Sequence, residues 1–150
     1  MKVVVQRCKK AKCTIDNKIT GEIEHGYMLL VGFTHTDSID TIDKMVKKII
    51  NLRIFEDENG KMNKNILQVN GSILSISQFT LYANTNEGNR PSFTNAMKPD
   101  LASNLYNIFN AKLKENNIVV ETGVFGADML VSIENDGPIT IIIDTKEKKD

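Results

Sequence analysis

The chain has 150 residues, which fits one domain with its own hydrophobic core, and we predict a single domain over residues 1–150. The chain has 19 basic residues (Lys and Arg) and 19 acidic residues (Asp and Glu). The resulting net charge of zero argues against a protein that binds long stretches of nucleic acid. The composition, 41% hydrophobic and 25% charged, is typical of a soluble globular protein, and no apolar run is long enough to span a bilayer.

The N-terminal part reads as a meander of antiparallel strands. A β-branched run covers residues 2–7, and further strand-like runs cover 13–15, 19–23 and 27–33. Turn residues separate the later runs, at Asp16-Asn17 and at His25-Gly26.

Two cysteines, Cys8 and Cys13, fall in this region, and no secretory signal precedes them. Two thiols in a chain without such a signal indicate a reduced, cytoplasmic protein. No histidine lies close to the pair in the sequence, which makes a zinc site a poor interpretation. We therefore expect neither a metal nor another cofactor.

The middle of the chain combines a helix with short strands. Ser38 or Asp37 can cap a helix, and apolar side chains then recur at spacings of three and four, at Ile39, Ile42, Met45, Val46, Ile49 and Ile50. A short strand over 53–55, a turn over 57–60 and a strand over 72–77 follow. A loop rich in Asn and Gly then covers 84–90.

A second helix and three strands are predicted for the last third. Pro99 begins a helix that ends near Asn116, and its predicted apolar stripe is Leu101, Leu105, Ile108, Phe109 and Leu113. Strand-like runs cover 118–121, 129–134 and 139–144, and a charged tail follows from residue 146. Strands, two amphipathic helices and more strands predict a mixed α/β fold.

A Gly-Pro pair, Gly137-Pro138, stands between the last two strand-like runs. Such pairs usually mark turns, which favours a hairpin that joins 129–134 to 139–144. A functional interpretation competes with it. Glycine lets a backbone approach a ligand closely, and proline fixes φ and removes a donor, so the pair can present carbonyl oxygens rigidly.

Six short segments occur in the order and spacing of one protein family. They are residues 52–55 (LRIF), 60–63 (GKMN), 77–81 (SQFTL), 88–93 (GNRPSF), 123–127 (GVFGA) and 135–140 (NDGPIT). Through them the chain resembles the D-aminoacyl-tRNA deacylases, the D-tyrosyl-tRNA deacylase family, from residue 1 to about residue 144. Ile139 is a small departure, because the family more often has valine after the Gly-Pro pair.

The resemblance implies a fold, an assembly and an activity. The implied α/β fold is mixed, with largely antiparallel, barrel-like β-sheet layers and two main helices packed outside, in a symmetric homodimer whose active site lies at the subunit interface. The implied reaction is hydrolysis of the ester at the 3′ end of D-aminoacyl-tRNA, without metal or cofactor. Glycyl-tRNA, including glycine mischarged on tRNA-Ala, is also cleaved under this interpretation, and L-aminoacyl-tRNA is rejected.

The implied catalytic residues are Ser77, Gln78, Phe79 and Thr80. Thr80 can serve as a nucleophile only with an adjacent base, and both histidines, His25 and His35, lie outside the family segments. We favour a second mechanism, in which the 2′-hydroxyl of the terminal adenosine activates water. Backbone amides of Phe79 and Thr80 then stabilise the developing oxyanion, and the Gln78 and Thr80 side chains shape the pocket.

The resemblance also implies a chirality filter and an adenosine slot. The Gly137-Pro138 peptide is expected to be cis and to enter the active site of the other subunit, where its carbonyls exclude an L side chain. Arg7 is the implied brace, since a guanidinium can donate to several carbonyls. The implied slot residues are Phe125, Met129 and Ala102, and core packing is the alternative role for Phe125 and Met129.

Two other functions stay open at this point. An L-seryl-tRNA editing module, as attached to some threonyl-tRNA synthetases, shares the implied fold, although this chain carries no synthetase body and its 77–80 segment is intact. A dimeric protein that binds RNA ends without catalysis is the other alternative, and a turnover assay separates it from an enzyme.

Overall fold

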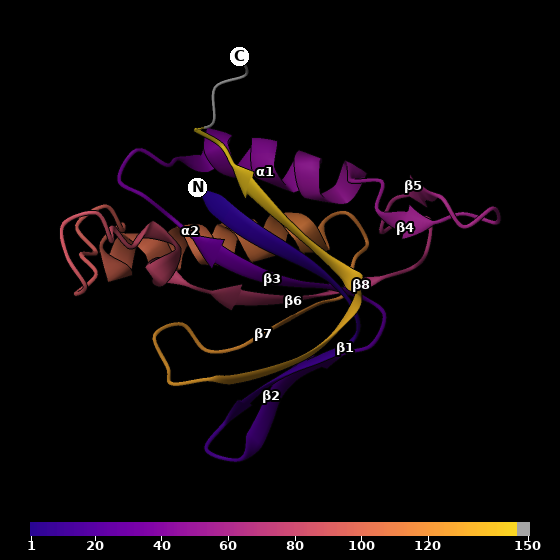
Figure 1. Ribbon diagram of the computed structural model, residues 1–150, viewed down its shortest axis with the longest axis horizontal. Coiled ribbons are helices and arrows are strands. Elements are labelled where there is room, and N and C mark those ends of the chain that lie inside the picture. The colour runs from indigo at the N-terminus through magenta and orange to yellow at the C-terminus, as the bar shows by residue number, and fades with distance from the viewer. Residues whose placement is uncertain (147–150) are drawn as a thin grey trace.

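The computed structural model describes residues 1–146, and 147–150, the end of the expected charged tail, lie outside that part. Its elements in chain order are β1 (Lys2–Ile15), β2 (Lys18–Ile23), β3 (Gly26–Gly32), α1 (Ile39–Asn51), β4 (Phe55–Glu56), β5 (Met62–Lys64), β6 (Ser72–Ser77), the 3-10 helix η1 (Phe79–Tyr82), α2 (Pro99–Lys114), β7 (Val120–Thr122) and β8 (Leu130–Asp144). Figure 1 shows how these elements are arranged.

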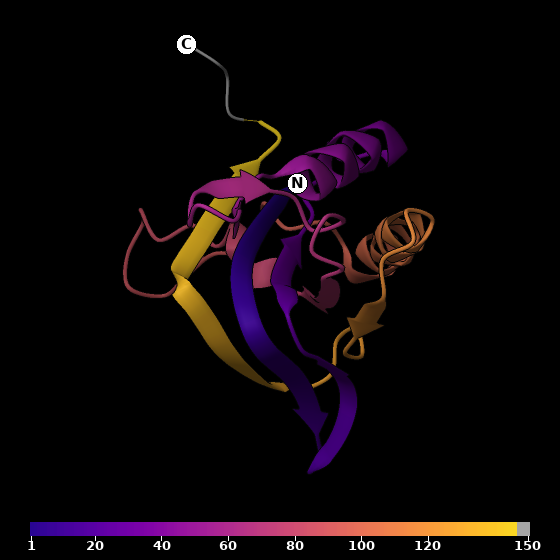
Figure 2. The same ribbon diagram turned by 90° about the vertical axis from the view of Figure 1, so that its right-hand side faces the viewer.

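One strongly curved sheet organises the molecule. Its strand order is β2-β1-β3-β6-β7, with β8 paired to β1, and β4 and β5 form a separate ribbon. Figure 2 shows both helices on the same side of the curved sheet, where they cover the larger hydrophobic core. The predicted class is confirmed: the fold is mixed α/β with a nearly closed, barrel-like sheet.

β1 is the central strand because it is 14 residues long and has room for two partners along one edge. Its first half pairs antiparallel with β3, its second half pairs antiparallel with β2, and β8 lies along its other edge. The expected meander is therefore wrong, since β3 pairs with β1 and not with β2. β3, β6 and β7 run parallel to one another.

The two sides of the sheet carry separate apolar clusters. The helix side buries Val3, Val5, Leu29 and Ile73 together with side chains from α1 and α2. The opposite side buries a smaller cluster, which consists of Cys8, Ala11, Cys13, Ile23, Met28, Leu74 and Ile76. Because side chains alternate along a strand, neighbouring residues such as Met28 and Leu29 serve opposite clusters.

Both helices form where the sequence predicts them, but their buried faces differ from the predicted apolar stripes. Ser38 is the N-cap of α1, and Ile39, half exposed at 50%, lies outside the buried stripe. In α2 the buried face consists of Ala102, Tyr106, Phe109, Asn110 and Leu113. Leu101 is 51% exposed, so the predicted stripe is wrong at its first position.

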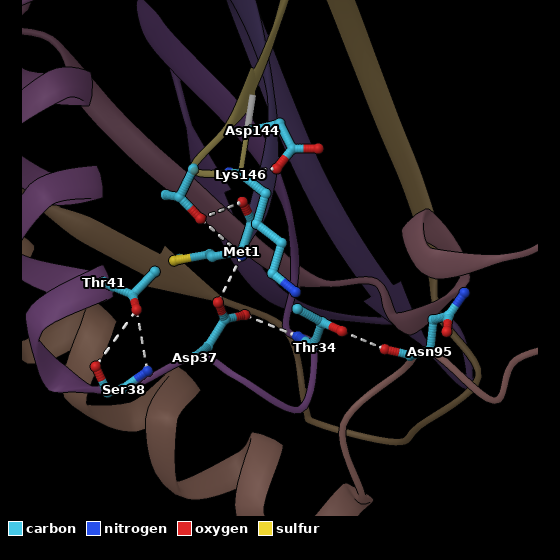
Figure 3. Close-up of polar contacts among 9 residues, drawn as sticks. Met1, Thr34, Asp37, Ser38, Thr41, Asn95, Asp144 and Lys146 are labelled. Atoms are coloured by element: carbon cyan, nitrogen blue, oxygen red, sulfur yellow. Dashed lines mark hydrogen bonds and ion pairs between the residues drawn. The ribbon is translucent and has the colours of Figure 1, made fainter. Parts of the chain in front are cut away.

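Asp37 has another role than the cap. One oxygen of its carboxylate accepts a hydrogen bond from the amino group of Met1 at 2.7 Å, and the other accepts one from the backbone N–H of Thr34 at 2.7 Å. The Thr34 hydroxyl in turn donates to the carbonyl of Asn95 at 2.5 Å. Figure 3 shows this chain of contacts, which ties the start of β1 to the segment before α2.

β8 is continuous, and the hairpin favoured by local sequence is wrong. Both halves of β8 pair antiparallel with the same strand, β1. A hairpin would reverse the chain, and its second half would then run parallel to β1. The Gly-Pro pair instead occupies an irregularity within one long strand.

Candidate active site

A cavity of about 650 Å³ opens where β6 ends, η1 begins and α2 starts. Its wall contains Ser77, Gln78 and Phe79 on one side and the segment from Phe125 to Met129 on another. A volume of this size suits a small molecule or a nucleoside. The wall is predominantly apolar, with a few polar groups where β6 ends.

The turn from β6 into η1 exposes backbone donors. The N–H of Gln78 donates to the carbonyl of Val31 at 2.7 Å, which holds the end of β6 against β3. Gly32 permits this approach, because a Cβ atom there would lie 2.9 Å from the carbonyl oxygen of Gln78. Within residues 1–146, the N–H groups of Phe79 and Thr80 have no backbone acceptor, as expected for the first residues of a helix.

Thr80 lies beside the cavity and not in its wall. Its hydroxyl accepts a short hydrogen bond from the side-chain amide of Gln78. Neither histidine contacts it: His35 bonds the carbonyl of Thr94 at 2.6 Å, and His25 packs edge-on against Phe55. In the part of the chain that the structure describes, no base hydrogen-bonds the Thr80 hydroxyl.

The structure brings the predicted adenosine residues into the same cavity as the predicted catalytic segment. Ala102, from the first turn of α2, Phe125 and Met129 all line it. Phe125 packs against Tyr106, with ring centroids 6.0 Å apart, and the Tyr106 hydroxyl donates to the carbonyl of Ser75 at 2.6 Å. The apolar wall is thereby fixed to β6, the strand that leads into the predicted catalytic segment.

Sequence reasoning missed several residues of the wall. Phe93 ends the 88–93 family segment, to which we assigned no site role, yet it lines the cavity and its ring packs edge-to-face on Phe79 with centroids 5.1 Å apart. Met97, Lys98 and Pro99 also line the cavity, just before and at the start of α2. A usable signal was present in the sequence, since Phe93, like the predicted site residue Phe79, is an aromatic residue within a family segment.

The Gly-Pro pair lies elsewhere on the same chain. Gly137 and Pro138 are exposed and do not line the cavity, and the bond between them is cis, as the resemblance implies. Arg7 is 5% exposed and donates to two carbonyls, from Nε to Asp136 at 3.1 Å and from Nη1 to Ile54 at 2.7 Å. Neither accepting carbonyl belongs to Gly137 or Pro138, and the role of Arg7 as a brace stays a prediction.

Residues 1–146 offer neither a cluster of metal ligands nor a membrane-spanning helix. That region contains no group of three or more His, Cys, Asp or Glu side chains placed to hold a metal ion. It also contains no helix with the length and hydropathy needed to cross a bilayer. Both cysteines are buried and free.

Comparison with known proteins adds a family match. A family model described as D-Tyr-tRNA(Tyr) deacylase matches residues 4–144. The fold is similar to a solved structure described as a c-Myc DNA unwinding element binding protein, at TM-score 0.93 and 39% identity over 98% of this chain and 100% of that one. It is also similar to a structure described as a "probable eukaryotic D-amino acid tRNA deacylase", at TM-score 0.79 and 16% identity over 95% and 97% of the two chains, which shows the fold alone.

Proposed function

The chain belongs to the D-Tyr-tRNA(Tyr) deacylase family and is a hydrolase of D-aminoacyl-tRNA, and on that basis we propose how it cleaves its substrate and selects for chirality. The terminal adenosine enters the 650 Å³ cavity, and the ester lies against residues 77–80. Water attacks the ester carbonyl, and the 3′ oxygen of the ribose leaves with the tRNA.

One observation carries this proposal: a single cavity joins Ser77, Gln78 and Phe79 to the apolar wall of Ala102, Phe125 and Met129. An adenine packed on the Phe125 ring gains about 1–3 kcal/mol from stacking. That contact holds the ester in place, and correct placement is itself a large part of the rate enhancement for an ester that is already activated.

The residues near the ester favour a substrate-assisted mechanism. A threonine nucleophile needs a base, and the described residues offer none to Thr80, whose hydroxyl accepts the Gln78 amide. The 2′-hydroxyl of the terminal ribose lies next to the ester in any aminoacyl-tRNA and can orient the attacking water. The free N–H groups of Phe79 and Thr80 are suitable donors to the oxyanion that forms.

Chirality is selected by backbone in this proposal. The carbonyls of Gly137 and Pro138 face the α-amino group of the substrate, so an L side chain collides with the main chain and a D side chain points away. Since the pair is exposed and does not line the cavity of its own chain, it serves the cavity of a second copy in a homodimer. Glycine has no side chain to exclude, and glycyl-tRNA, including glycine on tRNA-Ala, is therefore a substrate.

A deacylation assay on tRNA charged with D-Tyr, L-Tyr or Gly tests the proposal. Rapid release of D-Tyr and Gly with slow release of L-Tyr is expected. Rapid release of L-Tyr would refute the filter, and no release of D-Tyr would favour a protein that only binds RNA ends. Release of serine from L-seryl-tRNA, with D-Tyr-tRNA left intact, would favour the editing-module alternative.

A further inference from the structure

The Gly-Pro segment is a bulge opposite one residue of β1. Gln6 pairs with Thr140 and Cys8 pairs with Asn135, so residues 136–139 have only Arg7 across from them. Three extra residues in one strand of a ladder form a loop that the ladder itself does not hold. Side chains must therefore fix the direction of its carbonyls.

Arg7 fixes only the first carbonyl of the bulge. Its Nε donates to the carbonyl of Asp136 at 3.1 Å, and the same atom lies 3.6 Å from the Asp136 carboxylate. No side chain within residues 1–146 donates to the carbonyls of Gly137 or Pro138. Their orientation then depends on what holds the far end of the bulge, at Ile139.

Asn135 holds that far end. Its Oδ1 accepts the N–H of Ile139 at 2.7 Å, and its Nδ2 donates to the carbonyl of Ile139 at 3.2 Å. Nδ2 also donates to the Thr140 hydroxyl at 3.0 Å and to Oε1 of Gln6 at 3.3 Å. Because the N–H of Ile139 can only donate, these contacts fix which end of the amide faces it.

One amide therefore closes the bulge at both of its ends and joins it to β1. Gly137, in the middle, has φ +135°, and a Cβ atom there would lie 2.7 Å from Cγ1 of Ile139. A small movement of Ile139 thus changes the space around Gly137. We propose that Asn135 is a positioning residue for stereoselection, a role that rests on the proposed function of the Gly-Pro pair.

Asparagine is suited to this task because it supplies a donor and an acceptor on one planar group. Aspartate can still accept the N–H of Ile139, but its second oxygen would face the Ile139 carbonyl and Oε1 of Gln6, which are both acceptors. Alanine removes every contact. Asn135→Asp thus removes only the donor half of the amide, whereas Asn135→Ala removes both the donor and the acceptor.

The test measures deacylation of D-Tyr-tRNA and L-Tyr-tRNA by the same preparation of each variant and reports the ratio of the two rates. We expect Asn135→Ala and Asn135→Asp to lower the D-to-L ratio about tenfold or more, since displacement of about 1 Å at a reacting centre changes rates by up to about a hundredfold. A matched control is Asn116→Ala, which removes an exposed asparagine that donates to the carbonyl of Lys112 at 2.9 Å. It should leave the ratio at the wild-type value.

The ratio distinguishes positioning from folding, because loss of folded protein lowers both rates equally. If Asn135→Ala yields no folded enzyme, Asn135→Asp carries the test alone. A wild-type D-to-L ratio in the folded Asn135 variants overturns this inference and leaves the filter intact. A wild-type enzyme that cleaves both esters equally fast refutes the proposed filter itself, whatever the variants do.

Discussion

At the scale of single residues, Thr80 decides between the two catalytic mechanisms. Among residues 1–146 its hydroxyl has one hydrogen-bond partner, the amide of Gln78, and the residue lies beside the cavity. That arrangement suits a residue that orients Gln78 and the η1 turn. It does not supply the proton acceptor that a nucleophilic hydroxyl needs.

We predict that Thr80→Ala lowers the single-turnover rate on D-Tyr-tRNA by no more than about tenfold, because only one neutral hydrogen bond is lost. A 3′-aminoacyl substrate whose terminal ribose lacks the 2′-hydroxyl should react about 10²–10⁴-fold more slowly, the usual contribution of general base catalysis. The reverse pattern would identify Thr80 as the nucleophile. In that case Thr80→Ala would lose most of its single-turnover rate while it bound the substrate normally, and the 2′-deoxy substrate would be cleaved at the normal rate.

Cys8 yields a prediction about reactivity. The side chain is fully buried, and burial raises the pKa of its thiol to about 11, whereas a free thiol titrates near 9. Since only the thiolate reacts, at pH 8 the native Cys8 should be alkylated by iodoacetamide about a hundredfold more slowly than in urea-unfolded protein. Peptide mass spectrometry reads the extent of labelling. Equal rates in the two states would show that the thiol is accessible and ionised.

At the scale of elements, α2 shows how a helix is recognised correctly while its buried face is shifted. The predicted stripe began at Leu101, yet the structure buries Ala102, Tyr106, Phe109 and Leu113. These four follow spacings of four, three and four, so they form a face as good as the predicted one. An alanine and a tyrosine do not stand out in a search for large aliphatic side chains.

Two substitutions in α2 test this assignment. Phe109→Ala removes a fully buried ring and should lower the free energy of unfolding by about 3–5 kcal/mol. Leu101→Ala, at a side chain that is 51% exposed, should change it by less than about 0.5 kcal/mol unless a second subunit covers that surface. Urea titrations followed by circular dichroism measure both. A loss at Leu101 comparable to that at Phe109 in the isolated subunit would contradict the observed face.

Local pattern was sufficient for most elements and failed where partners are distant in sequence. The apolar runs around Val4, Leu29 and Ile73 indicate strands without saying which strands pair. Local sequence also favoured a hairpin at Gly137-Pro138, because nothing near the pair reveals that both halves of β8 have the same partner strand. The wall residues Met97 and Lys98 were missed for the same reason, since they reach the cavity through the fold.

At the scale of the whole molecule, the cavity and the Gly-Pro bulge are separate features of one chain. The bulge is exposed, and the cavity wall contains neither Gly137 nor Pro138. Large apolar side chains are exposed as well, including Leu130 and Ile142 of β8, at 68% and 66%. A second copy that covers such side chains and inserts its bulge into the cavity accounts for both observations.

Subunit mixing tests this arrangement. Phe125→Ala damages the cavity of the chain that carries it, and Gly137→Val damages the bulge, because φ is +135° there and a Cβ atom would strike Ile139. If the bulge serves the partner's cavity, a heterodimer of the two variants combines an intact cavity with an intact bulge at one of its two sites. The other site carries both defects.

Random exchange of equal amounts makes half of the dimers heterodimers, so about a quarter of all sites become native. The mixture should therefore recover about a quarter of the wild-type, D-selective rate, while each variant alone does not. The matched control mixes Phe125→Ala with Ala102→Val, two changes in the same cavity, and should recover nothing. If the first mixture merely equals the average of its parents, although mass spectrometry shows that heterodimers have formed, each bulge serves its own chain and the shared site is refuted.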